Sequence, residues 1–352
     1  MRNQDKKAFL DWAVSYIPTK SRLKGPLQVE ALAGDAGSRR YFRLNTQPSL
    51  IAVDSPPAQE NNPAYVAVAM ALQTQGIRTP TIYAVDFARG FLLLEDFGYD
   101  LLQPLLNEHS LGEHYQLAES TLLAIQQTAP QTQTFPIYNA PRLRAEMALF
   151  EDWFLGEMLG INLDRDEISL MDNLFDALID SALTQPQVVV HGDYHSRNLM
   201  LLPDKSLGVI DFQDAVLGPV TYDLVSLLKD CYVRWPPQQM RERAIAFKSR
   251  SPHCNALEQE QFLRWFDLMG LQRHIKVMGV FARLALRDGK QSYLNDLPLV
   301  IRYSLEVAKA YPETAGFYDW FLHRVEPALS AQAWYSDWQM AGERPITEGG
   351  VK

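Results

Sequence analysis

The stretch that decides the fold is residues 188–214, which read VVVHGDYHSRNLMLLPDKSLGVIDFQD. Two short apolar runs, 199–202 and 207–210, flank a four-residue polar turn, and this pattern predicts a β-hairpin. In an antiparallel hairpin the start of the first strand lies beside the end of the second. We therefore expect Asn198 and Asp211 to be neighbours at one rim of this hairpin.

The side chains at this rim are the oxygen donors that magnesium-assisted phosphoryl transfer requires. Asn198 and Asp211 provide an amide oxygen and a carboxylate, which are hard ligands suited to Mg²⁺. Asp193, five residues before Asn198, provides a separate carboxylate that can accept the proton of an attacking hydroxyl group. A lone aspartate in such a place more often caps a turn or ends a strand. The order and spacing of all three residues favour the catalytic interpretation.

The sequence on either side of this stretch predicts an α+β protein. Strand-like runs and two helical runs fill the first hundred residues: helices at 7–17 and 63–75, and strands at 27–32, 41–44, 50–53, 81–85 and 91–94. Long helical periodicities follow. We expect a small β-rich N-terminal lobe of residues 1–97 and a larger, mainly helical lobe of residues 98–352.

The composition limits the class of protein and its partners. The 352 residues include 33 Lys+Arg and 42 Asp+Glu, for a net charge of −9, which argues against a nucleic-acid partner. A hydrophobic content of 47% excludes intrinsic disorder. There are two cysteines, the N-terminal residues do not resemble a signal peptide, and no apolar run is long enough to span a bilayer. We expect a cytoplasmic protein without a membrane partner, and no obligate protein partner can be read from the sequence.

The hairpin and the loop before it resemble the aminoglycoside phosphotransferase and choline kinase family, whose members have the two-lobed protein-kinase-like fold. The resemblance implies that ATP and Mg²⁺ are used. It implies that Asp193 is the catalytic base and that Asn198 and Asp211 are the metal ligands. Asp223 would brace the catalytic loop.

Four further residues near the catalytic base have roles that the resemblance leaves less defined. His191 would orient the loop. Arg197 would neutralise the transferring phosphoryl group or only pin the loop, and His195 is a weaker candidate for the same role. Asp214 would either assist the metal site or lie at the surface.

The N-terminal lobe departs from the pattern of the family. The loop at 34–38, GDAGS, has two glycines in place of three, and Gly34, Gly37 and Ser38 are expected to border the nucleotide. No lysine lies between Lys24 and Lys205, so the lysine that usually clamps the phosphate groups is missing.

An arginine can replace this lysine, because the guanidinium group has a fork geometry that matches phosphate oxygens. The candidates are Arg39, Arg40 and Arg43, and we assign Arg43 to the nucleotide site. Glu95 and Phe97 belong to a hinge whose backbone would meet the adenine ring.

A basic face on a later helix bears on the acceptor. The run at 268–286 predicts one helix, apolar around most of its circumference, and no Asp or Glu lies between Asp267 and Asp288. Four basic residues fall within a stripe of roughly 80°; they are Arg273, Lys276, Arg283 and Arg287. A buried, unpaired basic stripe needs acidic partners from neighbouring helices or an anionic ligand. The second alternative favours an acidic or neutral acceptor over a polycationic aminoglycoside.

The chain is also similar, nearly end to end, to bacterial anomeric kinases that act on N-acetylmuramate and N-acetylglucosamine in peptidoglycan recycling. The segments that carry this resemblance are 34–44, 54–57, 93–98, 150–154, 193–198 and 271–276. The resemblance implies an ATP-dependent sugar kinase that gives a sugar 1-phosphate, with Asp193 deprotonating the C1 hydroxyl group. Arg273, His274 and Lys276 would then contact the amino sugar.

Two alternatives to this function stay open at this point. One is a phosphotransferase for another small alcohol, of the aminoglycoside or choline type. The other is a nucleotide-binding pseudokinase, which the missing lysine favours and the presence of Asp193, Asn198 and Asp211 opposes. Gly192 stands where the family usually has arginine, which bears on how the loop is braced.

Overall fold

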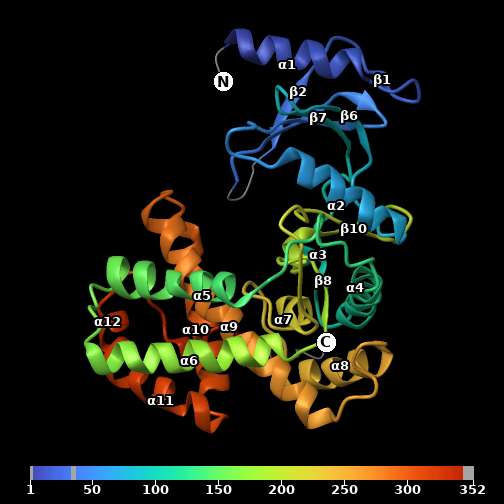
Figure 1. Ribbon diagram of the computed structural model, residues 1–352. Helices are drawn as coiled ribbons and strands as arrows, with labels where there is room; N and C mark the ends of the chain where they lie inside the picture. Colours follow the sequence, from blue (N-terminus) through green and yellow to red (C-terminus); the bar gives the residue numbers. More distant parts are fainter. Residues whose placement is uncertain (1–2, 33–36, 344–352) are drawn as a thin grey trace, which may run out of the picture. The chain divides into compact units, whose positions relative to one another are not determined.

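A computed structural model describes residues 3–32 and 37–343, and its elements are labelled in Figure 1. The chain divides into two compact units. Unit 1 consists of Met1–Pro136 with His191–Val216, and unit 2 consists of Ile137–Val190 with Leu217–Lys352. The lobe boundary expected after residue 97 stays a prediction.

Unit 1 contains a five-stranded antiparallel sheet in the order β2-β3-β5-β7-β6. Its strands are β2 (Val29–Leu32), β3 (Arg40–Leu44), β5 (Leu50–Asp54), β6 (Ile82–Asp86) and β7 (Phe91–Glu95). All five residues of the central strand β5 are buried, which agrees with its apolar sequence LIAVD. The strands expected in this region are confirmed, with boundaries shifted by two residues at most.

Two helices accompany this sheet. α1 (Asn3–Ser15) packs on it through Phe9, whose ring centre lies 5.0 Å from that of Phe91. α2 (Asn62–Thr74) begins where the Asn61 side chain accepts a hydrogen bond from the backbone N–H of Ala64. It ends before Gly76, because a right-handed helix cannot continue through a residue whose φ is 75°. Both helices predicted in the first hundred residues are therefore confirmed.

The remainder of unit 1 holds the hairpin predicted from the sequence. β9 (Leu199–Leu201) pairs antiparallel with β10 (Leu207–Val209), and Leu199 lies opposite Val209. The short β1 (Arg22–Leu23) pairs with β4 (Thr46–Gln47). The helical elements are α3 (Leu102–Leu105), α4 (Leu111–Gln126) and the single turn η2 (Ser196–Asn198).

Unit 2 is mainly helical and is built around α9 (Gln259–Leu286). The strands β8 (Gln187–Val190) and β11 (Val216–Pro219) form a two-stranded sheet. They lie at two of the points in the sequence where the chain passes from one unit to the other, after Val190 and after Val216. The helices before α9 are α5 (Ala140–Leu149), η1 (Phe150–Met158), α6 (Arg165–Leu183), α7 (Tyr222–Leu228) and α8 (Pro237–Arg250). Those after it are η3 (Gln291–Asn295), α10 (Leu297–Ala308), α11 (Pro312–Trp320), η4 (Phe321–Val325), α12 (Glu326–Ser330) and η5 (Trp338–Met340).

The predicted helix at 268–286 is the C-terminal part of α9, and it is buried around most of its circumference as expected. Gly279 explains how α9 packs so closely. A Cβ atom at this position would lie 2.2 Å from the carbonyl carbon of Leu149, where α5 meets η1. Only glycine allows the two backbones to approach to this distance.

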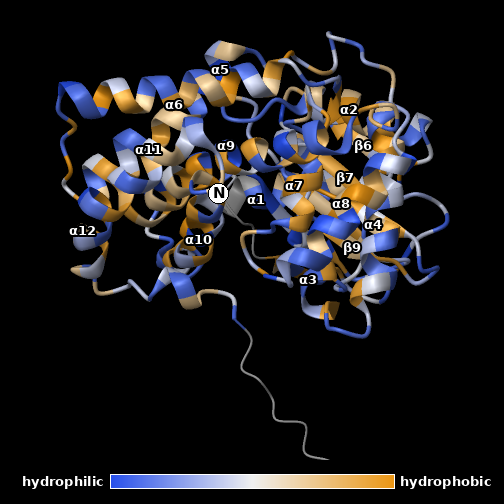
Figure 2. Cartoon of the chain, turned by 90° about the horizontal axis from the view of Figure 1, so that it is seen from below, coloured by the Kyte–Doolittle hydropathy of each residue, from blue (hydrophilic) through white to orange (hydrophobic). Residues whose placement is uncertain are grey.

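The helices of unit 2 carry both hydrophilic and hydrophobic residues, as Figure 2 shows. Within residues 3–32 and 37–343, none of the helices combines the length and apolar character that crossing a membrane requires. The expected α+β class, with a β-rich part and a larger helical part, is confirmed.

Candidate active site

Unit 1 brings together the three residues at the predicted rim of the hairpin. Nδ2 of Asn198 donates to the backbone carbonyl oxygen of Asp193 at 2.9 Å and lies 3.5 Å from Oδ2 of Asp211. The backbone N–H of Ile210 donates to the carbonyl oxygen of Asn198 at 3.1 Å, which joins the two ends of the hairpin. The amide nitrogen of Asn198 makes both side-chain bonds, so its amide oxygen is the atom that would ligate a metal.

Asp211 has an unusual backbone conformation and a carboxyl group with a raised pKa. Its φ is 62°, a left-handed conformation that aspartate adopts more readily than most residues. Burial raises the pKa of its carboxyl group; a hydrogen bond from Gln213 opposes this shift, and the charges of Asp193 and Asp214 add to it. A bound cation would relieve this crowding of negative charge.

The donor set therefore fits Mg²⁺. Among the described residues, no three His, Cys, Asp or Glu side chains gather into a metal cage. A magnesium site in a kinase does not need one, because Mg²⁺ is commonly held by one or two carboxylates while water and phosphate oxygens complete its coordination. Asn198 and Asp211 would hold the ion in this way.

Two histidines border Asp193, the predicted catalytic base. Nδ1 of the buried His191 accepts a hydrogen bond from the backbone N–H of Asp193 at 3.2 Å, so Nε2 carries the proton and donates to the carbonyl oxygen of Ile210 at 3.0 Å. This ring links the loop at Asp193 to the hairpin, and its role in orienting the loop stays a prediction. Nε2 of His195 lies 3.3 Å from Oδ1 of Asp193, whose side chain is 49% exposed.

Gly192 explains the departure from the His-Arg-Asp pattern. Its φ is 91°, a conformation that side chains other than glycine rarely adopt. Arg197 donates from Nε to Oε1 of Gln103 in α3 at 3.0 Å. This bond agrees with the alternative that Arg197 pins the loop; its contact with a phosphoryl group stays a prediction.

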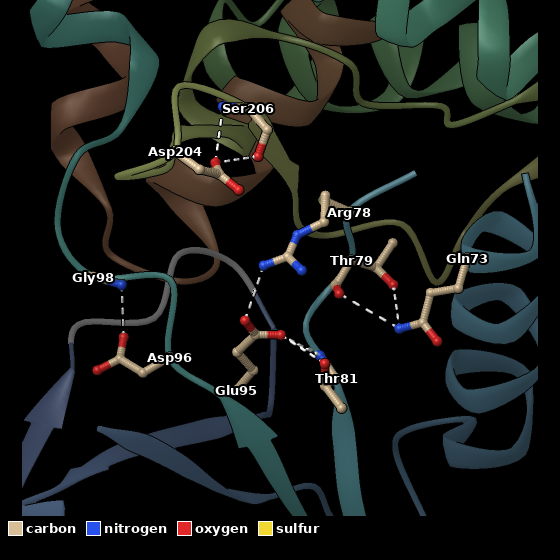
Figure 3. Close-up of polar contacts among 9 residues, drawn as sticks. All are labelled: Gln73, Arg78, Thr79, Thr81, Glu95, Asp96, Gly98, Asp204 and Ser206. Carbon is tan, nitrogen blue, oxygen red and sulfur yellow. Dashed lines mark hydrogen bonds and ion pairs between the residues drawn. The ribbon is translucent and has the colours of Figure 1, made fainter. Parts of the chain in front are cut away.

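The hinge side chains are held in a polar network, shown in Figure 3. The Glu95 carboxylate accepts hydrogen bonds from the backbone N–H and Oγ1 of Thr81, at 3.1 and 2.6 Å, and pairs with Arg78 at 3.0 Å. The carbonyl oxygen of Arg78 accepts from the N–H of Val209 at 2.8 Å. The network thus connects the end of β7 to the hairpin strand β10. It engages the side chain of Glu95, whose backbone N–H also donates to the carbonyl oxygen of Thr81 at 2.8 Å. The contact of the hinge with a nucleotide base stays a prediction.

Phe97 lies in a small apolar cluster that sequence reasoning missed. The cluster consists of Phe97, Met200 and Leu202, with Leu101 and Ile210 packed against it. A Cβ atom at Gly208 would lie 2.7 Å from the ring of Phe97, so glycine is required for this packing. The cluster joins the hinge to Ile210, the residue before Asp211. The contact of Phe97 with the nucleotide stays a prediction.

Arg43, predicted to contact the nucleotide, is engaged by the hinge. Its guanidinium group binds the Asp96 carboxylate, donates to the carbonyl oxygen of Gly98 at 2.8 Å and lies 3.7 Å from the ring centre of Tyr99. These contacts tie β3 to the hinge. A phosphate contact by Arg43 stays a prediction that this geometry does not favour.

The described end of the glycine-containing loop is tied to a residue that the sequence did not single out. The backbone N–H and Oγ of Ser38 donate to Oε1 of Glu60, at 3.1 and 2.5 Å, and Arg39 pairs with Oε2 at 2.9 Å. Gly37 lies beside the same carboxylate. Gly34 lies outside the described residues.

The basic stripe in unit 2 is partly paired, which agrees for Lys276 with the alternative that an acidic partner comes from a neighbouring helix. Nζ of Lys276 lies 2.8 Å from Glu146 and 3.2 Å from the hydroxyl group of Tyr222, and Arg287 pairs with Asp288 at 2.7 Å. Burial lowers the pKa of Lys276. The effects of Tyr222 and Glu146 raise this pKa by more than burial lowers it, so the net shift is upward and the lysine is charged. The acidic partner Glu146 comes from α5, so its position could not be read from the sequence of α9.

Two further residues assigned to the acceptor lie in the interior of unit 2. Arg273 is buried with its guanidinium group 5.6 Å from the ring of Tyr222. The His274 ring is fully buried, stacks on Tyr303 at 5.1 Å and places Nε2 3.0 Å from the carbonyl oxygen of Lys229. Burial lowers the pKa of His274 to about 3, so the ring is neutral at physiological pH. A substrate contact by His274 stays a prediction that this position does not favour.

Asp223, expected to brace the catalytic loop, is buried in the first turn of α7. This helix belongs to unit 2, whereas the loop belongs to unit 1. The bracing role of Asp223 therefore stays a prediction.

Comparison with known sequences is consistent with this site. A family model described as "Phosphotransferase enzyme family" matches residues 28–268. A protein of Pseudomonas aeruginosa is 40% identical over 313 residues, which cover 86% of this chain and 92% of the relative. A protein of Neisseria meningitidis is 35% identical, covering 81% of this chain and 87% of the relative. Both relatives are named N-acetylmuramate/N-acetylglucosamine kinase.

Solved structures share the fold at low identity. The choline kinase LicA from Streptococcus pneumoniae is 14% identical, with a TM-score of 0.60 over 85% of this chain and 98% of the other. The aminoglycoside phosphotransferase APH(2'')-Ib is 12% identical, with a TM-score of 0.56 over 87% and 99%. The kinase-like fold expected from the sequence is confirmed.

Proposed function

Because the chain belongs to the phosphotransferase enzyme family, and within it to the group that contains these bacterial kinases, it is a phosphotransferase, and we propose that it phosphorylates the anomeric hydroxyl group of N-acetylmuramate or N-acetylglucosamine. The phosphoryl donor is ATP and the product is a sugar 1-phosphate. The reaction serves peptidoglycan recycling in the cytoplasm. The family assignment made from the sequence motifs is confirmed by the matching model and relatives.

The geometry around Asp193 carries this proposal. Its carboxylate is half exposed, while its backbone is fixed by hydrogen bonds from Asn198 and to His191. A carboxylate held in this way can accept the proton of the C1 hydroxyl group and direct its oxygen atom toward the phosphoryl group. The proton moves to Oδ of Asp193 as the C1 oxygen bonds to the γ-phosphorus of ATP. The bond between this phosphorus and the oxygen that bridges to the β-phosphate breaks, and ADP leaves with that oxygen.

Asn198 and Asp211 hold Mg²⁺ in this proposal. When bound, the ion neutralises charge on the phosphate oxygens of the donor. The left-handed backbone of Asp211 and the hydrogen bonds from Asn198 fix the two ligands beside the catalytic loop. Arg197 assists by pinning this loop through Gln103.

We assign an acceptor contact to Lys276; the contacts predicted for Arg273 and His274, which are buried in unit 2, are not part of this proposal. Lys276 keeps 22% of its side chain exposed, although it is paired with Glu146. The pair presents both a donor and an acceptor, which suits the hydroxyl and acetamido groups of an amino sugar. The names of the relatives support this class of acceptor.

The experiment incubates the purified protein with ATP, Mg²⁺ and N-acetylmuramate, and follows the products by phosphorus NMR. We expect a new phosphate signal split by the anomeric proton, together with ADP. If the protein phosphorylated an aminoglycoside or choline, but neither N-acetylmuramate nor N-acetylglucosamine, the proposed acceptor would be wrong. Binding of ATP without transfer to any of these acceptors would identify a pseudokinase.

A further inference from the structure

The contacts of unit 1 distinguish among the three arginines that follow the glycine-containing loop. No lysine lies between Lys24 and Lys205, so one of these arginines is the natural candidate for binding the phosphate groups of the donor. Arg43 is occupied by Asp96 and Gly98 in the hinge. Arg40 pairs with Asp54, and 43% of its side chain is exposed.

Arg39 differs from both in its burial and its neighbours. Only 8% of its side chain is exposed, and NH2 lies 2.9 Å from Oε2 of Glu60. Its guanidinium carbon lies 5.4 Å from the ring centre of Tyr65. The Tyr65 ring in turn lies 4.9 Å from the ring of Phe212, the residue after Asp211. A short series of contacts therefore connects Arg39 to the segment that carries the proposed metal ligand.

Tyr41 belongs to the same neighbourhood. Burial raises the pKa of Tyr41 to about 12; Arg39 opposes the shift through its charge and a hydrogen bond, while Asp211 and Glu60 add to it. One hydroxyl group thus interacts with Arg39, Asp211 and Glu60 together. The arginine and the metal ligand lie within electrostatic reach of the same atom.

Glu60 binds the hydrogen-bond donors at the end of the loop. Its carboxylate accepts from the N–H and Oγ of Ser38 and from Arg39, so three donors converge on one anionic group. A backbone N–H, a hydroxyl group and a guanidinium group are the donors that bind phosphate oxygens in proteins. The arrangement holds them in a fixed orientation next to the loop.

We propose that Arg39 is the cation that contacts the phosphate groups of the nucleotide and that Glu60 is a positioning residue for Arg39 and Ser38. This inference rests on the proposed function, because it requires a nucleoside triphosphate as donor. In protein kinases a lysine that is paired with a glutamate contacts the phosphate groups of the nucleotide. Here an arginine takes the place of the lysine, and its glutamate lies just before α2.

The test compares the binding of ATP with Mg²⁺ and of adenosine to the full-length protein by isothermal titration calorimetry. A charge-assisted hydrogen bond contributes enough that Arg39→Ala should raise the Kd for ATP by about tenfold to a hundredfold. The Kd for adenosine should not change, because adenosine has no phosphate group. Arg40→Ala, the matched control, should change neither constant.

Two further variants separate positioning from packing. Glu60→Gln keeps the size of the side chain and should weaken ATP binding, but less than Arg39→Ala, again without an effect on adenosine. Arg39→Lys keeps the charge and should restore part of the affinity for ATP. Unchanged adenosine binding shows in each case that the protein is folded.

Several results would overturn the inference. Equal losses of ATP and adenosine in Arg39→Ala would mean that Arg39 only supports the fold of unit 1. Unchanged ATP binding in this variant, with normal binding by the wild type, would contradict the inference alone. A wild-type protein that binds no ATP would contradict the proposed function as well.

Discussion

The guanidinium group of Arg43 makes two hydrogen bonds to the carboxylate of Asp96, at 2.6 and 3.0 Å. Both side chains are buried, and Gly98 contributes a carbonyl oxygen to Arg43 and an N–H to Asp96. The pair therefore fixes the hinge segment 95–98 to strand β3. Its strength bears on stability rather than on phosphate binding.

Arg43→Ala should destabilise the protein by about 3 kcal/mol, because it leaves the buried carboxylate of Asp96 without its cation. Urea unfolding followed by tryptophan fluorescence measures the loss. Arg89→Ala, which breaks the exposed pair with Asp86 in the same unit, is the matched control and should change the midpoint much less. Similar losses in the two variants would contradict a structural role for the hinge pair.

The Arg43–Asp96 pair should also contribute to acid sensitivity. Burial raises the pKa of Asp96, but the hydrogen bonds from Arg43 and Gly98 outweigh burial, so the net shift is downward. A carboxyl group with a lowered pKa in the folded protein stabilises it above the unfolded pKa of about 3.9. This contribution should be lost as pH falls through the lowered pKa. In urea unfolding measured across the acid range, Asp96→Asn should therefore weaken the protein at pH 7 and make its unfolding below pH 4 less dependent on pH.

Asp193→Asn should lower the rate of phosphoryl transfer by about a hundredfold to ten-thousandfold, since it removes the general base. The affinity for ATP should remain, because the backbone carbonyl group that binds Asn198 is retained. Steady-state kinetics and calorimetry measure the two effects. Asp204→Asn, at the exposed turn of the hairpin, is the control and should keep its activity. Normal turnover by Asp193→Asn would exclude Asp193 as the base.

Asp211→Asn should remove the effect of magnesium on nucleotide binding. In the wild type, we expect ADP to raise the Tm more in the presence of Mg²⁺ than in its absence. The amide of the variant is a weaker ligand and lacks the negative charge. Thermal unfolding with ADP, with and without Mg²⁺, checks this. A difference of wild-type size in the variant would assign the metal to other residues.

His274 should make the stability of the protein depend on pH. Burial lowers its pKa to about 3 in the folded protein, against about 6.5 in the unfolded chain. The unfolded state binds the extra proton between these values, so stability should fall by up to about 1.4 kcal/mol per pH unit as pH drops from 6.5 toward 3. In urea unfolding across this range, His274→Gln should reduce the slope of the free energy of unfolding against pH by the amount that corresponds to one bound proton. His253→Gln, at an exposed position, is the matched control.

The parts of the fold that the sequence predicts correctly depend on neighbouring residues. The hairpin β9–β10 follows from two apolar runs and a polar turn, so the proximity of Asn198 and Asp211 could be predicted from the sequence alone. α2 has its capping asparagine and its terminal glycine in the sequence itself. The same holds for the strands of the five-stranded sheet, each of which is a short run rich in apolar residues.

The candidate site was less predictable where the contacts join distant segments. Glu60 carries no signal of its own, and its position beside Ser38 depends on how the start of α2 lies against the loop. Gly208 gave no sign that it receives the ring of Phe97. The stripe on α9 has the predicted residues, but its partner Glu146 comes from α5.

The sequence by itself determined the elements, the kinase-like class and the trio of Asp193, Asn198 and Asp211, because hydrogen-bond register and turn chemistry are set by residues close together in the chain. The tertiary structure decided what each basic side chain does. Arg43 binds the hinge, Arg39 binds Glu60 and Lys276 binds Glu146. A guanidinium or ammonium group takes whichever carboxylate the packing brings within about 3 Å, and no local pattern specifies that partner.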